Sequence, residues 1–108
     1  MNELDVKRVG ECHVVMPSGE RIDASNAARF RTACIGALPS DARAVIDLST
    51  LRFIDSSGIG ALVAVARHLD ETSQLGLVVN HPSLRSLLEI TRIDQVLAVH
   101  DNLASATA

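Results

Sequence analysis

Aromatic residues are scarce in this sequence, which has two phenylalanines and neither tryptophan nor tyrosine among 108 residues. The hydrophobic share is nevertheless 47%, so aliphatic side chains and alanine must fill the core. A run of eighteen apolar residues is also missing, which argues against a membrane-spanning helix. The first residues lack a basic stretch followed by an apolar one, so no secretory signal is expected. These features predict a cytoplasmic protein without membrane insertion, with residues 1–108 forming a single domain.

Basic residues are too few and too scattered for a nucleic-acid-binding surface. The formal net charge is −3, whereas a nucleic-acid binder needs a basic face to neutralise phosphates. The two cysteines, Cys12 and Cys34, are far apart and have neither Cys-x-x-Cys nor metal-ligand spacing. We interpret them as buried free thiols in a reducing compartment.

Motifs of catalytic, metal and cofactor sites are missing as well. The four histidines have no His-x-x-x-His spacing, and no Gly-x-Ser-x-Gly elbow is present. The short Gly58-Ile59-Gly60 segment is not a nucleotide-binding fingerprint. We therefore expect a protein that is not an enzyme and holds neither a metal nor a cofactor.

Strand and helix patterns alternate along the chain. The first two strands are separated by a turn at Gly10-Glu11, and Asp23 or Ser25 can cap the first helix. This order predicts a small α/β domain with a mixed sheet and helices packed mainly on one face. The expected strands are 4–9, 13–16, 44–48, 75–79 and 95–99, and the expected helices are 24–38, 57–71, 82–91 and a final turn at 102–106.

The expected helix over 57–71 has two unlike sides. Its larger apolar residues should face the sheet, and its opposite side is small or neutral instead of charged. Either another part of the fold covers this opposite side, or it is kept flat for a partner protein. The side facing the sheet comprises Ile59, Leu62, Val63, Ala66 and Leu69, and the opposite side comprises Gly60, Ala61, Ala64 and His68.

The segment Asp55-Ser56-Ser57-Gly58 lies where a buried strand gives way to this helix. Backbone N–H groups at a helix start are unpaired and favour an added anion. Either serine could simply cap the helix, or one of them could accept a phosphate while the other caps. A carboxylate at Asp55 would interact favourably with the helix dipole. The chemistry of these residues leaves both roles open.

Residues 55–60, between a strand and an apolar helix, resemble the phosphorylation motif of bacterial anti-sigma factor antagonists, the STAS-domain family. The resemblance covers nearly the whole chain and implies a STAS fold with four to five strands. It implies that Ser56 accepts phosphate from an anti-sigma factor that is also a serine kinase. The unphosphorylated form would bind this kinase and free a sigma factor, and a metal-dependent serine phosphatase would reset the switch.

The resemblance also implies a partner-binding surface around Ser56. Arg21-Ile22-Asp23 matches the end of a family signature whose aspartate contacts the kinase, although Glu20 replaces the usual glycine. Arg92 also replaces a common glycine, which we interpret as tolerated because the backbone there need not be left-handed. An alternative role is a non-switching scaffold in a lipid-transporting ABC complex or a stress-sensing assembly. The expected partner-binding residues are Asp23, Asp55, Ser57, Gly58, Gly60, Ala61 and Ala64.

Overall fold

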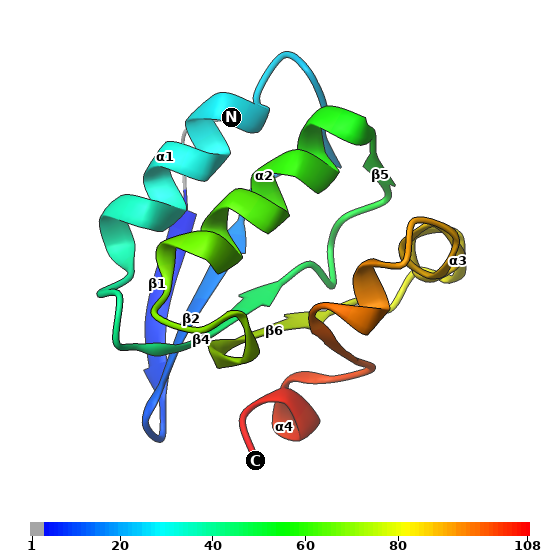
Figure 1. The fold of residues 1–108 in the computed structure, drawn as a ribbon. Coiled ribbons are helices and arrows are strands. Elements are labelled where there is room, and N and C mark those ends of the chain that lie inside the picture. The colour runs from blue at the N-terminus through cyan, green and yellow to red at the C-terminus, as the bar shows by residue number, and fades with distance from the viewer. Residues whose placement is uncertain (1–3) are drawn as a thin grey trace.

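The computed structural model describes residues 4–108, which form a mixed five-stranded sheet in the order β1-β2-β4-β6-β7 (Figure 1). The strands are β1 (Leu4–Val9), β2 (Cys12–Pro17), β3 (Arg21–Ile22), β4 (Arg43–Asp47), β5 (Phe53–Ile54), β6 (Leu75–Val78) and β7 (Ala98–His100). The helices are α1 (Ala27–Ala37), α2 (Ser56–His68), α3 (Pro82–Ile90) and α4 (Leu103–Ala106), with 3₁₀ turns η1 (Thr72–Gln74) and η2 (Ile93–Gln95). The part of the secretory-signal prediction that rests on residues 1–3 lies outside the described residues.

The sheet combines one hairpin with parallel strands, as the sequence predicts. Strands β1 and β2 are antiparallel, and Val9 is paired with Cys12 across the predicted turn. Gly10 in that turn has φ +60°, a backbone conformation that glycine adopts without steric cost. Strands β2, β4, β6 and β7 are parallel to one another. Crossover connections between parallel strands place α1, α2 and α3 beside the sheet.

The helices lie mainly on one face of the sheet, which confirms the predicted architecture (Figure 1). Consecutive strand residues point to opposite faces, so Val15 packs under α1 and α2 while Val14 belongs to the cluster beneath α4. Phe30 of α1 and Leu62 of α2 are both fully buried in the larger cluster. Within the described residues, no helix is both long and apolar enough to cross a membrane.

The two cysteines are free and buried, as predicted. Cys34 lies on the buried face of α1 together with Ala27, Phe30 and Leu38. Burial raises the pKa of the Cys34 thiol to about 12. This thiol is therefore part of the apolar packing and remains protonated at neutral pH.

Several predicted boundaries were wrong. Helix α1 begins at Ala27 instead of residue 24, with Asn26 at the N-cap position and neither Asp23 nor Ser25 there. Helix α2 ends at His68 instead of residue 71. The last strand begins at Ala98, because 93–95 form the turn η2. The parallel pair of β3 and β5 was not predicted, since two-residue strands show no hydrophobic period.

The prediction for the orientation of α2 was partly wrong. Its buried residues are Gly58, Ala61, Leu62, Val65 and Ala66. The helix is therefore rotated toward α1, which packs beside it (Figure 1), and Ala61 and Val65 are both buried. Ile59 and Val63 are only partly buried, although both were predicted to face the sheet.

The interpretation of Arg92 is also corrected. Its φ of 63° and ψ of 21° lie in the left-handed region, and it is the one non-glycine residue with positive φ among residues 4–108. The left-handed conformation is costly for a residue with a Cβ atom. The glycine expected at this position thus has a physical reason, because the chain must turn sharply from α3 into η2.

Candidate functional site

Asp55, and neither of the two serines, caps helix α2. The Asp55 residue occupies the N-cap with extended backbone, and its Oδ1 accepts a hydrogen bond from the Gly58 N–H at 3.1 Å. The Asp55 carbonyl accepts the bond from the Ile59 N–H at 3.0 Å. The capping role considered for Ser56 and Ser57 is therefore filled by the carboxylate before them.

The same carboxylate connects α2 with the segment that precedes α1. Its Oδ2 accepts a hydrogen bond from the Ala24 N–H at 3.1 Å. Next to this bond, the Asp55 N–H donates to the Ile22 carbonyl at 3.2 Å, continuing the parallel pairing of β3 with β5. Two segments distant in sequence are thereby held side by side, and the predicted site residues Asp23 and Asp55 lie on neighbouring strand ends.

Asp23 organises the turn before α1. Its Oδ1 accepts hydrogen bonds from the N–H of Ser25 at 2.9 Å and from the Ser25 hydroxyl at 2.5 Å. Its Oδ2 pairs with Nε of Arg21 at 3.3 Å. The hydrogen bonds from Ser25, aided by Arg21, lower the pKa of the Asp23 carboxyl. Asp23 is therefore a partly exposed carboxylate in a fixed position.

Gly58 permits the close approach of α2 to β3. A Cβ atom at this position would collide with the side chain of Ile54 and lie 2.9 Å from the Ile22 carbonyl oxygen. Gly60 is different, because a Cβ atom there would meet no other atom within 4 Å. The requirement for glycine in the motif is thus specific to position 58, and it is a packing requirement.

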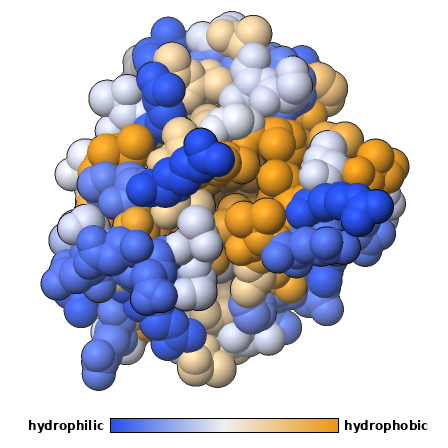
Figure 2. Space-filling model, in the orientation of Figure 1, coloured by the Kyte–Doolittle hydropathy of each residue, from blue (hydrophilic) through white to orange (hydrophobic). Residues whose placement is uncertain are grey.

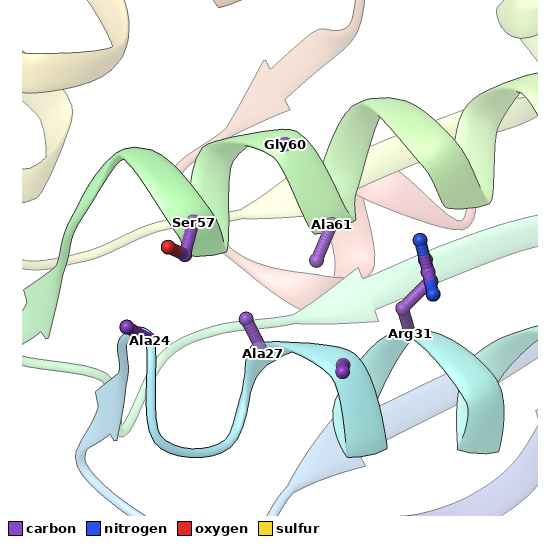
Figure 3. A pocket seen from close by; sticks show the side chains of 7 residues that line it. Ala24, Ala27, Arg31, Ser57, Gly60 and Ala61 are labelled. Carbon is purple, nitrogen blue, oxygen red and sulfur yellow. The ribbon is translucent and has the colours of Figure 1, made fainter.

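The hydroxyls of Ser56 and Ser57 both lie at the surface and form no hydrogen bond with the described part of the chain. Figure 3 shows Ser57 and Ala61 pointing from α2 toward α1. The two helices enclose an open groove of about 390 Å³. Ser56, one residue earlier, does not line this groove. The groove is lined by Ala24, Ala27, Ala28, Arg31, Ser57, Gly60 and Ala61.

The structure brings most of the predicted site residues together, but not on one surface. Asp23, Asp55 and Gly58 surround the start of α2, with Gly58 buried. The three small residues predicted as a partner surface differ in exposure: Gly60 is exposed, Ala64 is partly buried, and Ala61 is only 5% exposed. Ala61, which was predicted as a partner-binding residue, is instead covered by α1, the first of the two alternatives for this side of α2.

Sequence reasoning missed two features of this region. The guanidinium of Arg21 stacks over the ring of Phe53 with 4.4 Å to the ring centroid, which joins β3 and β5 at the surface. Arg31 of α1 lines the groove opposite α2. No motif marks these residues, because their proximity depends on the pairing of β3 with β5 and on the packing of α1 against α2.

Comparison with known proteins identifies the family. The model of the STAS domain matches residues 3–106, so the chain belongs to the STAS domain family. No curated protein sequence matches this chain significantly. The predicted fold and family are thus both confirmed.

Solved structures agree with this assignment. An anti-sigma factor antagonist from Mycobacterium paratuberculosis is 27% identical, with a TM-score of 0.85 over 96% of this chain and 89% of that one. An anti-sigma-factor antagonist (STAS) domain protein from Planctomyces limnophilus is 21% identical, with a TM-score of 0.82 over 99% and 96%. The Bacillus cell fate determinant SpoIIAA, in a structure of its phosphorylated form, is 18% identical, with a TM-score of 0.57 over 93% of each chain. The last two show similarity of fold.

Proposed function

We propose that this chain is an anti-sigma factor antagonist controlled by phosphorylation of Ser56. The unphosphorylated protein binds an anti-sigma factor that is also a serine kinase, and this binding frees a sigma factor. The kinase transfers a phosphoryl group to Ser56 and the complex dissociates, after which a serine phosphatase restores the binding form. The 27% identical antagonist from Mycobacterium paratuberculosis supports this role.

The observation that carries the proposal is that the helix cap and the exposed hydroxyl at the start of α2 belong to different residues. Asp55 satisfies the helix cap, so the exposed Ser56 hydroxyl has no structural task in the described chain. A hydroxyl at the first position of a helix is easily reached by a kinase. It also lies beside backbone N–H groups whose partial positive charge favours a phosphate. The domain can therefore carry the modification without unfolding.

The switch then acts on the partner. A phosphoserine adds almost two negative charges and three strong hydrogen-bond acceptors. Buried in an interface, those charges must lose their hydration, and they repel any carboxylate that faces them. The Asp55 carboxylate beside Ser56 adds to the negative charge at this point. Phosphorylation therefore blocks docking directly, without a change of fold in this chain.

In this mechanism the protein acts by binding, and the chemistry of phosphoryl transfer belongs to the kinase. The kinase contributes ATP and Mg²⁺ from its own site. Asp23 offers the kinase a positioned carboxylate near the acceptor, and Gly58 keeps the start of α2 tight against β3. Ser57 and Gly60 add contacts along the exposed part of α2.

The experiment uses purified anti-sigma factor kinases from the organism that encodes this chain. Binding is measured by titration calorimetry for the wild type, for Ser56→Asp and for Ser105→Asp, a control on α4 at the opposite face of the sheet. We expect one kinase to bind the wild type and the control equally. Ser56→Asp should weaken binding at least tenfold. If Ser56→Asp binds as tightly as the wild type, or if none of these kinases binds, the proposal fails and a scaffold role replaces it.

A further inference from the structure

Strand β1 leaves one edge of the sheet open. Within the described chain, β1 pairs only with β2, and its other side has no partner strand (Figure 1). Val9 and Cys12 close the two-residue hairpin loop, and such a loop is closed by a hydrogen-bonded pair. Because N–H and C=O groups alternate in direction along a strand, the groups that point outward belong to Leu4, Val6 and Arg8.

The open edge carries an exposed apolar side chain. Val6 lies opposite Val15 of β2, on the helix-covered face of the sheet, and is 51% exposed. Helix α1 packs beside β1 on the same face but leaves Val6 uncovered. A strand added at this edge would continue the apolar row from Val15 through Val6 and remove Val6 from water.

Hydrophobic residues are also exposed between α2 and α3 (Figure 2). Exposed charges of both signs accompany them on these helices, such as Arg67 of α2 and Glu89 of α3. That area therefore does not select the charge of a partner, whereas the charges on β1 do.

The charges on β1 are complementary to those of a second β1. Asp5 and Lys7 flank Val6 and point to the opposite face of the sheet from it. Both are exposed, and neither forms an ion pair within residues 4–108. When a strand pairs antiparallel with a copy of itself, residues equally far from the central residue lie opposite each other. With Val6 at the centre, Asp5 of each copy therefore meets Lys7 of the other.

The backbone and the charges favour the same register. With Val6 at the centre, the outward groups of Val6 face each other and those of Leu4 face Arg8, so that each of these residue pairs exchanges two hydrogen bonds. A register centred on Asp5 or Lys7 also lets outward groups meet. It places two like charges directly opposite each other, however, which destabilises a strand pair. The register centred on Val6 avoids this repulsion and is therefore preferred.

Arg8, the remaining charged residue of β1, does not oppose this pairing. It lies opposite Leu4 of the second copy, where its aliphatic stem can cover the leucine while the guanidinium stays in water. The two Arg8 residues lie four positions apart along the strand pair, which is about 13 Å. At this distance salt largely screens the repulsion between exposed charges.

We infer that β1 pairs antiparallel with β1 of a second copy of this chain, with Val6 on the twofold axis. The five strands of each copy then form one continuous sheet, with the helices of both copies on the same face. Charges on an edge strand often prevent such pairing. Here their alternation in sign about Val6 makes the edge self-complementary, as a twofold dimer requires. The contact is small, so the dimer forms at high protein concentration.

The test measures self-association by sedimentation equilibrium from about 10 μM to about 1 mM protein. We expect the wild type to show a monomer–dimer equilibrium. Lys7→Glu places a glutamate opposite Asp5 twice in each dimer, so the Kd should rise at least about tenfold, and Asp5→Lys should act alike. Arg67→Glu and Asp94→Lys change the net charge by the same amounts at exposed positions outside β1. These two controls should keep the Kd within about threefold of the wild type.

A mixture of the two β1 variants gives the sharpest result. Asp5→Lys has two cations beside Val6 and Lys7→Glu has two anions there, so each variant repels itself while the two attract each other. Mixed in equal amounts, they should form a heterodimer at least about tenfold tighter than either homodimer. Circular dichroism confirms that each variant is folded, and a loss of folding could not produce this rescue.

Val6→Pro tests the backbone part of the contact. The Val6 N–H points outward, so proline keeps the pairing of β1 with β2 and removes the two hydrogen bonds at the centre of the dimer. The dimer should be lost while the circular dichroism spectrum is retained.

Three results would overturn the inference. One is a wild type that remains monomeric up to about 1 mM. Another is a dimer that persists unchanged in Lys7→Glu or Val6→Pro, and the third is a mixture no tighter than its components. A dimer that Ile90→Glu dissolves would also overturn it and place the contact between α2 and α3. None of these measurements uses a kinase or a phosphate, so they do not depend on the proposed function.

Discussion

The Oδ2 atom of Asp55 accepts a hydrogen bond from the backbone N–H of Ala24, 3.1 Å away and 31 residues earlier in the chain. With its other oxygen, Asp55 caps α2 through Gly58. One carboxylate thus holds the start of α2 and the Asp23 turn in a fixed relation. In the proposed mechanism, a kinase that approached Ser56 would meet both segments as one surface.

Removal of this carboxylate should destabilise the fold. Asp55→Ala is expected to lower the free energy of unfolding by about 1–2 kcal/mol, since it removes a helix cap and leaves the Ala24 N–H without its partner. Asp55→Asn keeps an acceptor and should cost less. The control Asp101→Ala removes an exposed ion pair and should cost under about 1 kcal/mol. Urea unfolding measures all three, and an Asp55→Ala cost no larger than the control would contradict the role given to Asp55.

The two glycines of the motif should respond in opposite directions. Gly58→Ala must displace the Ile54 side chain and crowd the Ile22 carbonyl, so we expect a loss of about 1–3 kcal/mol. Gly60→Ala meets open space within a helix and should stabilise the protein by about 0.5–1 kcal/mol. Thermal unfolding of both variants measures the difference. Equal effects would show that α2 does not approach β3 as closely as described.

Replacement of Arg92 by glycine should stabilise the protein. The left-handed conformation at Arg92 costs about 1 kcal/mol in a residue with a Cβ atom, and glycine removes most of that cost. Arg92→Ala keeps the Cβ atom and serves as the control, with no expected gain. Denaturant midpoints compare the two variants. A gain from alanine as large as that from glycine would assign the effect to the lost charge instead of the backbone.

The buried thiol should make stability depend on pH in the alkaline range. The pKa of Cys34 is raised by burial to about 12 from a reference value of 9.0. Between these values the unfolded chain loses the thiol proton and the folded chain keeps it. The free energy of unfolding should therefore fall as pH rises through this window, by up to about 1.4 kcal/mol per unit.

Cys34→Ala provides the comparison. This variant lacks the titrating thiol. The slope of its free energy of unfolding against pH should therefore be shallower than that of the wild type between about pH 9 and 10.5. When the slope of the variant is subtracted from that of the wild type, the contributions of the other titrating groups cancel. Any pH-independent loss of stability from the smaller side chain does not change the slope. Identical slopes would place Cys34 in a more hydrated environment than the packing of α1 shows.

The sequence predicted the order of the main elements because its hydrophobic periods are clear where strands and helices are long. The hairpin, the strand predicted at 44–48 and the helix predicted to begin at residue 82 are all found in the structure, the strand displaced by one residue. The pairing of β3 with β5 could not be predicted, since two residues show no period. The rotation of α2 depends on where α1 packs, which no single-helix pattern contains.

The candidate site was predictable in its residues and less so in its geometry. The segment Asp55-Ser56-Ser57-Gly58 is visible as a helix start, but three of its residues are plausible caps. The choice of Asp55 follows from its second hydrogen bond, to Ala24, which depends on tertiary contact. For the same reason, the sequence left open whether another part of the fold or a partner protein covers Ala61, and in the structure α1 covers it.

Phosphorylation of Ser56 is the central claim, and the most direct measurement is the site of modification. The purified protein is incubated with the kinase that binds it, ATP and Mg²⁺, and tandem mass spectrometry then locates the phosphate. We predict one phosphate per chain on Ser56, retained in Ser57→Ala and lost in Ser56→Ala with the fold intact. A phosphate on Ser57, or equal phosphorylation of Ser56→Ala, would contradict the account.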